Sequence, residues 1–190
     1  MLRGVSNVHN IRKRLYFLLP ASLTALLQHT VHESLHYPAA RLLNAEVLEF
    51  RFLTNGWLTS QVIYATPVAE RVGAHWLVIA WTPAVLTTII GYALYVTRHR
   101  WLTSISLLNT GLWFATVYFL VVDPLYFAVL SPFFGGGDVA AAAAVGWPRW
   151  PVHLLAGLVL LFNLRLVYRL RQEGKAQPER YLPARKSTDQ

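Results

Sequence analysis

Long apolar blocks separated by short polar segments account for most of the sequence. Residues 15–43, 75–96, 101–122 and 150–170 each form a block long enough to cross the hydrocarbon core of a bilayer, and we expect four membrane helices there. Residues 125–137 are also apolar, but prolines and glycines interrupt them, so we expect a re-entrant or interfacial segment. The pattern predicts an all-α polytopic membrane protein with about four transmembrane helices and this short segment before the last one.

Between the first two blocks, the pattern changes to a period of two. Polar and apolar residues alternate over 47–52, and a second β-rich run follows at 57–64. Asn55-Gly56 lies between these runs, and this dipeptide is the strongest short signal for a β-hairpin. Because an isolated hairpin is only marginally stable in water, we expect it to lie on the membrane face or against other helices.

The composition supports a membrane protein. Hydrophobic residues make up 55% of the 190 residues and charged residues 14%, against about 25% charged in soluble domains. A chain of this length is expected to form one domain. Cysteine is absent, so disulfides and cysteine metal sites are excluded, and any bound metal must be held by histidine and carboxylate side chains.

The net charge of +8 is placed around the apolar blocks. Basic residues gather before the first block, between the second and third, and at the end of the last one: Arg3, Arg12, Lys13, Arg14, Arg98, Arg100, Arg165, Arg169, Arg171, Lys175, Arg180, Arg185 and Lys186. This placement follows the positive-inside rule and argues against nucleic-acid binding, which needs a basic face on a soluble fold. We expect an integral, multi-pass protein of the cell membrane with cytoplasmic N- and C-termini. The sequence leaves its oligomeric state open.

One short motif carries most of the chemical information. His32-Glu33-Ser34-Leu35-His36 has the H-E-x-x-H pattern and lies inside the first apolar block. On a helix, two histidines four residues apart share a face, so both imidazoles can reach one metal ion while the glutamate acts as a general base. Ionisable groups are costly inside a membrane helix, and they usually mark a functional site.

A catalytic zinc site needs a third protein ligand. From Tyr16 to His36 a helix rises about 30 Å, which places the motif near the outer surface of the hydrocarbon core. Asp138 is expected at the same depth and is our choice for the third ligand, because the glycines before it allow a close backbone approach. Asp138 could instead be the N-cap of the alanine-rich helix that follows.

The other histidines and aspartates offer alternatives. His29 lies on the same helical face as His32 and could be a ligand, a hydrogen-bonding partner of a ligand, a proton relay, or a packing residue. His75 and His153 open predicted membrane spans, where an interfacial histidine is ordinary. Asp123, before Pro124, is interpreted as a turn starter that closes the third span.

These residues together resemble the site-2 protease family of intramembrane metalloproteases. In that family H-E-x-x-H lies on a membrane helix and is followed by small residues and an arginine, as His36 is followed here by Ala39-Ala40-Arg41. A β-rich stretch comes next in the family, as residues 47–64 do here, and an aspartate after a proline-containing approach is the third zinc ligand, which corresponds to Asp138. The resemblance implies a membrane-embedded zinc endopeptidase.

In such an enzyme, Glu33 acts as general base on a zinc-bound water, and zinc polarises the scissile carbonyl. The substrate is a membrane protein or a membrane-adjacent peptide, and the edge of the hairpin could hold the unwound substrate strand. Residues 1–170 then form a membrane-embedded metalloprotease-like domain, and the polar residues 171–190 form a disordered cytoplasmic tail.

Two other classes of function fit the same residues. A metal-dependent lipid-modifying enzyme, such as a di-iron lipid oxidase, is one of them, although such sites need more histidine or carboxylate ligands than the spans contain. A non-proteolytic metal-binding membrane protein, such as a transporter or assembly factor, is the other.

Overall fold

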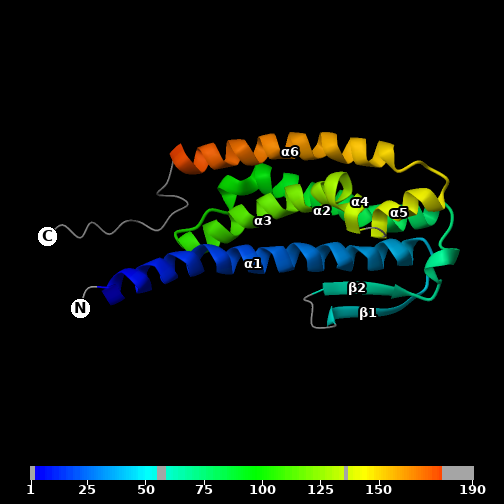
Figure 1. Ribbon diagram of the computed structural model, residues 1–190, viewed down its shortest axis with the longest axis horizontal. Helices are drawn as coiled ribbons and strands as arrows, with labels where there is room; N and C mark the ends of the chain where they lie inside the picture. The colour runs from blue at the N-terminus through cyan, green and yellow to red at the C-terminus, as the bar shows by residue number, and fades with distance from the viewer. Residues whose placement is uncertain (1–2, 55–58, 135–136, 177–190) are drawn as a thin grey trace.

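The computed structural model describes residues 3–54, 59–134 and 137–176. Four long helices run along the molecule (Figure 1): α1 (Arg3–Leu42), α2 (Ala74–Thr97), α3 (Ser106–Leu125) and α6 (Trp150–Ala176). Three segments are long and apolar enough to cross a membrane: Ala74–Arg100, Ser106–Phe133 and Trp150–Gly174. The mostly helical fold with several candidate membrane helices is therefore confirmed.

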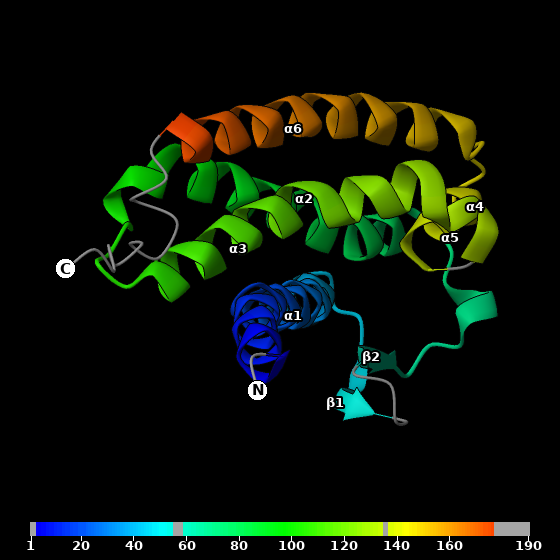
Figure 2. The same cartoon turned by 60° about the vertical axis from the view of Figure 1, so that its left-hand side comes forward.

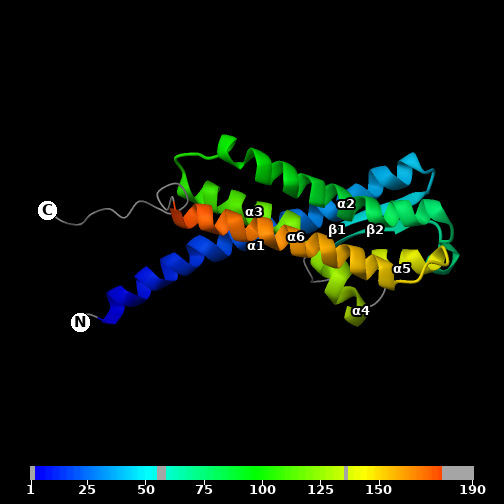
Figure 3. The ribbon, with the colours of Figure 1, turned by 90° about the horizontal axis from the view of Figure 1, so that it is seen from above.

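The helices form three layers. Helices α2 and α3 lie in the middle, with α1 on one side and α6 on the other (Figures 1 and 2), and both α2 and α3 contact α1. The amino-terminal end of α1, the short 3₁₀ turn η2 (Arg98–Arg100) and the carboxyl-terminal end of α6 lie at one end of the bundle (Figure 3). At that end the side chain of Arg98 forms an ion pair with Glu173, at an N–O distance of 2.6 Å, which joins α2 to α6.

The predicted β-hairpin is confirmed. Strands β1 (Val47–Thr54) and β2 (Thr59–Tyr64) pair antiparallel, with Val47 opposite Tyr64. Strand β2 lies beside α1, and β1 lies on the outside. The predicted Asn55-Gly56 turn falls outside the described residues. A 3₁₀ turn, η1 (Val68–Glu70), connects the hairpin to α2.

The third of the four expected membrane helices has other boundaries than predicted. Helix α3 begins at Ser106 and passes through Asp123-Pro124, so Asp123 does not start a turn. The helical path continues through a π-helical turn, η3 (Tyr126–Leu130), and the short helix α4 (Ser131–Phe134). The part of residues 125–137 that was expected to be irregular is thus helical as far as Phe134. A proline disturbs a helix less when other groups satisfy the carbonyl that it leaves without a donor.

A buried asparagine satisfies the carbonyl that Pro124 leaves without a donor. In an α-helix the N–H of residue 124 would bond to the carbonyl of Leu120, but proline has no N–H. The Asn163 side chain of α6 donates to that Leu120 oxygen at 2.6 Å, and it accepts a hydrogen bond from Tyr92 of α2 at 2.8 Å. Asn163 is 0% exposed. A single polar side chain therefore joins the three helices.

The π-helical turn releases a second carbonyl. The N–H of Ser131 bonds to the carbonyl of Tyr126, five residues back, and Pro132 cannot donate to Phe127 in the same register. His153 of α6 faces the Phe127 oxygen through Nδ1 at 2.7 Å. His153, expected only as an interfacial residue at the start of a span, is thus a link between η3 and α6.

Two core clusters lie at the end of the bundle opposite η2. One joins α2, η3, α5 (Gly137–Ala144) and α6, through Leu77, Phe127, Val139, Ala142 and Val152. The other joins α1 to α2 through Ala40, Trp76 and Ile79. These clusters fix the positions of α1, α2 and α5 relative to one another. Helix α6 extends to Ala176, so the first six residues of the expected tail are helical, and residues 177–190 lie outside the described part of the chain.

Helices α2 and α3 make direct backbone contact at Gly91. A Cβ atom there would lie 2.8 Å from the carbonyl carbon of Phe119 and 2.9 Å from the nitrogen of Leu120. We expect Gly91→Ala to force the two backbones apart and to lower stability by about 1–3 kcal/mol. Thermal unfolding in detergent measures this change, and Gly157→Ala is the matched control, because nothing lies within 4 Å of a Cβ at Gly157. Equal melting temperatures for both variants would contradict the close packing.

Candidate metal centre

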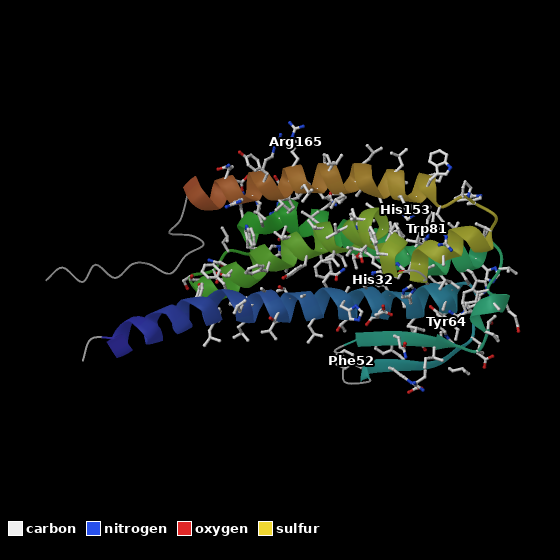
Figure 4. All side chains as sticks on the ribbon, viewed as in Figure 1. His32, Phe52, Tyr64, Trp81, His153 and Arg165 are labelled. Carbon is white, nitrogen blue, oxygen red and sulfur yellow. The ribbon has the colours of Figure 1, made fainter. Side chains whose placement is uncertain are left out.

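The two motif histidines are buried one turn apart on α1. His32 and His36 are each 8% exposed, and their ring centroids are 5.3 Å apart. Figure 4 shows His32 on the side of α1 that faces the other helices. The four-residue spacing and the packing of α1 against α2 and α3 place both imidazoles inside the protein.

Asp138 comes to this position from the first turn of α5. The preceding Gly137 has φ of +60°, a conformation that glycine adopts easily, and a Cβ there would lie 2.9 Å from the hydroxyl of Tyr126. Trp81 of α2 donates its indole N–H to the Asp138 carbonyl at 2.9 Å. The start of α5 is therefore held on both sides, and the Asp138 carboxylate is directed toward α1.

The three side chains converge through atoms suited to a metal. His32 Nε2 lies 3.2 Å from Asp138 Oδ2, and His36 Nε2 lies 3.6 Å from Asp138 Oδ1. One ligand atom from each residue falls in a group whose members all lie within 4.8 Å of one another. Tetrahedral Zn²⁺ with ligands at about 2.0–2.1 Å places neighbouring ligand atoms about 3.3 Å apart. The two nitrogen–oxygen distances found here are close to that value.

A proline in α2 supplies the partner of His36. Pro83 lacks the N–H that would bond to the carbonyl of Ile79, and His36 Nδ1 lies 3.1 Å from that oxygen. A carbonyl only accepts hydrogen bonds, so the His36 proton belongs on Nδ1 and the Nε2 lone pair faces Asp138. The orientation of this imidazole is thereby fixed by α2.

Asp123 of α3 plays the corresponding part for His32. Its Oδ1 lies 3.0 Å from His32 Nδ1, in a contact that is close but not well aligned as a hydrogen bond. Its Oδ2 accepts hydrogen bonds from Gln28, at 3.0 Å, and from Thr87. Gln28, Thr87 and Asp123 are all buried. The carboxylate favours a proton on Nδ1, which leaves the His32 Nε2 lone pair toward Asp138.

The arrangement of acceptors is suited to a cation at the centre. Each imidazole has an acceptor near Nδ1 and a carboxylate oxygen near Nε2, whereas a neutral imidazole has only one N–H. Protonating His32 alone would still leave the His36 Nε2 lone pair facing Asp138 Oδ1. Protonating both rings would place two positive charges side by side among buried residues, which is costly. One metal ion between the two Nε2 atoms and Asp138 would satisfy all three groups.

A cleft of about 620 Å³ opens onto these residues. Glu33 lines it together with His32, His36 and Asp138, so the carboxylate of the motif faces the same space as the three converging side chains. Other walls come from β2, from η3 and from the residue after η1: Gln61, Val62, Tyr64, Arg71, Tyr126 and Leu130. The hairpin, which is distant in sequence from α5, thus forms part of the same cleft.

The residues singled out in the sequence fall into two groups. His32, Glu33, His36 and Asp138 meet at one cleft. His29 also lines the cleft, but it is not a member of the converging group found among the described residues. Sequence reasoning missed Asp123, interpreted as a turn starter, and Arg71. A buried aspartate inside an apolar span was the available signal for Asp123, because charges in membrane helices usually have partners.

Comparisons with protein-family models, with curated proteins and with solved structures find no match to this chain. The similarity to site-2 proteases therefore stays a prediction that depends on the motifs and on the geometry described above.

Proposed function

We propose that this protein is a membrane-embedded zinc endopeptidase that cleaves membrane proteins or membrane-adjacent peptides. The observation that carries the proposal is the convergence of two imidazole Nε2 atoms and the Asp138 carboxylate, with an acceptor placed near each Nδ1 atom. Glu33 lies in the same cleft and completes the set of groups that peptide hydrolysis requires.

The donor set fits zinc better than a di-iron centre. Two imidazoles and one carboxylate are one of the common sets of three protein ligands of catalytic zinc, with a fourth position left open. A di-iron site needs several more carboxylate or histidine ligands, and the described residues contain only this group of three. When bound, Zn²⁺ would polarise the scissile carbonyl and make a water molecule more acidic.

Other groups of the protein would transfer the proton, orient the two imidazoles and bind the substrate. Glu33 takes a proton from the attacking water and passes it to the leaving amine. Asp123 and the Ile79 carbonyl hold the two imidazoles in orientation from behind. The neighbouring strand β2 offers an extended backbone at the wall of the cleft, along which a substrate strand could lie.

The proposal places α1 in the membrane as a fourth span. Leu15, Leu19, Leu23 and Leu27 lie four residues apart along one face of α1, and each is more than half exposed. Such a face is suited to lipid. One end of the bundle holds η2, the amino-terminal end of α1 and the carboxyl-terminal end of α6. This end would face the cytoplasm, because the basic residues gather there. The cleft would then open toward the outer side.

Zinc analysis of purified variants tests the metal centre. We expect His32→Ala, His36→Ala and Asp138→Ala each to reduce bound zinc to below about a tenth of the wild-type content, because each removes one of three ligands. His29→Ala is the matched control and should retain zinc, since His29 lines the cleft without joining the group. Full zinc in Asp138→Ala, or loss of zinc in His29→Ala, would contradict the assignment of the third ligand.

A further inference from the structure

Arg71 is a cationic side chain in the wall of the cleft. It follows η1, and its Nε donates to the Thr66 carbonyl at 3.0 Å. Its guanidinium carbon lies 4.8 Å from the centre of the Tyr64 ring and 5.3 Å from that of Trp76. Contacts with both the hairpin and α2 therefore fix the side chain in one place, and little conformational freedom is lost when it binds a ligand.

This guanidinium has no acidic partner in the described part of the chain. Arg51 pairs with Glu49 and Arg98 with Glu173, whereas no carboxylate oxygen among the described residues lies within 4 Å of Arg71. Burial lowers the pKa of Arg71, which reflects the cost of holding an unpaired charge away from water. An arginine fixed in this way, without a carboxylate, is suited to bind one from a ligand.

A ligand bound to Arg71 would lie next to the candidate metal centre. Arg71 lines the 620 Å³ cleft and also an adjoining cavity of about 260 Å³, and both spaces are lined by His36 and Asp138 as well. An anion that reaches the guanidinium therefore occupies the space that opens onto the converging histidines. Tyr64, whose ring lies under the guanidinium, also lines both spaces, and its buried hydroxyl has no hydrogen-bond partner among the residues that the structure describes.

We infer that Arg71 binds a carboxylate group of the substrate and so directs cleavage to peptides that carry a negative charge near the scissile bond. This inference rests on the proposed peptidase function for the identity of the ligand as a peptide. A carboxylate can come from the free C-terminus of a peptide or from an aspartate or glutamate side chain, and both fit the planar fork of the guanidinium.

Peptide binding to an uncleaving variant tests the inference. The full chain carrying Glu33→Gln is loaded with zinc in a zwitterionic detergent, and binding of fluorescein-labelled decapeptides is followed by anisotropy. Three peptides share one neutral sequence: one has a free C-terminus, one is amidated, and one is amidated with a single internal glutamate. We expect a carboxylate-bearing peptide to bind about 10–100 times more tightly than the neutral one.

Substitution of Arg71 must remove that preference. Adding Arg71→Gln should reduce the difference to within about twofold, and Arg71→Lys should restore part of it, because lysine keeps the charge but loses the two-pronged geometry. Arg51→Gln, which removes a partly exposed arginine on β1, is the matched control and should keep the full preference. The peptide that binds better identifies the source of the carboxylate.

Several outcomes would overturn the inference. One is that all three peptides bind equally well, or that no peptide binds. Another is an unchanged preference in Arg71→Gln. A third is Arg71-dependent binding of dihexanoyl phosphatidic acid, titrated in the same assay, without any peptide preference, which would make the site a lipid-phosphate site. The assay needs no cleavage, so its result does not depend on the proposed peptidase function. An Arg71-dependent preference together with no proteolysis by the wild type would support the carboxylate site and refute the peptidase.

Discussion

Replacing Glu33 with glutamine is expected to abolish peptide-bond cleavage while zinc stays bound. The side chain keeps its size and still lines the cleft, but an amide cannot accept a proton from water. General base catalysis contributes about 10²–10⁴-fold, so we expect a rate loss of that order. The three proposed ligands are untouched, and the zinc content should match that of the wild type.

Cleavage of membrane-anchored reporter peptides, measured beside the zinc content of the same preparations, checks this result. Ser34→Ala is the control, because Ser34 is the next residue on α1, is exposed, and donates its hydroxyl to the Thr30 carbonyl of its own helix. That variant should cleave at the wild-type rate. Normal cleavage by Glu33→Gln would rule out the glutamate as the base. Zinc binding without cleavage by the wild type would favour a non-proteolytic metal-binding protein.

Asp123→Asn is expected to weaken zinc binding by about 10–100-fold, although Asp123 is not a proposed ligand. Groups that hydrogen-bond to ligating histidines commonly have effects of this size, because they fix the ring and increase its basicity. The neutral amide would leave His32 Nδ1 without a nearby charge and would disturb the contacts from Gln28 and Thr87. His36, whose partner is the Ile79 carbonyl, would keep its orientation.

Competition with a chromophoric chelator at constant pH measures the zinc affinity of Asp123→Asn. Thr116→Val is a suitable control, since Thr116 is a buried polar residue of the same helix, and its hydroxyl bonds within α3 to the Leu112 carbonyl at 2.8 Å. It should change the affinity by less than about twofold. An Asp123→Asn protein that binds zinc as tightly as the wild type would show that the carboxylate does not orient His32.

The helices and the hairpin could be predicted because their signals are local. Helices α2 and α6 begin at Ala74 and Trp150, close to the expected residues 75 and 150, since the length of an apolar run decides where a helix can cross a membrane. The predicted end of α3 at Asp123-Pro124 was wrong, because the residue that compensates for Pro124 is on a different helix. Asn163 satisfies the free carbonyl, and no local pattern reveals that contact.

The candidate site was predictable to the extent that its residues carry a motif. The H-E-x-x-H spacing is informative by itself, and Asp138 was chosen because glycines precede it, although it lies 106 positions after His32. Asp123 and Arg71 belong to no motif. Their roles depend on which side chains lie opposite them after folding, so only the three-dimensional arrangement brings them into the argument.

A helix that contains a carbonyl without its own donor is incomplete by itself in lipid, where no water is available to fill the gap. Helix α2 is in this condition at Ile79, and α3 is at Leu120, until donors arrive from α1 and α6. During biogenesis, each unsatisfied acceptor would therefore favour docking of one particular helix in one particular register, because only that helix brings the donor into place. In the proposed metal centre, His36, which also completes α2, would be in place to bind an ion only after the helices have assembled.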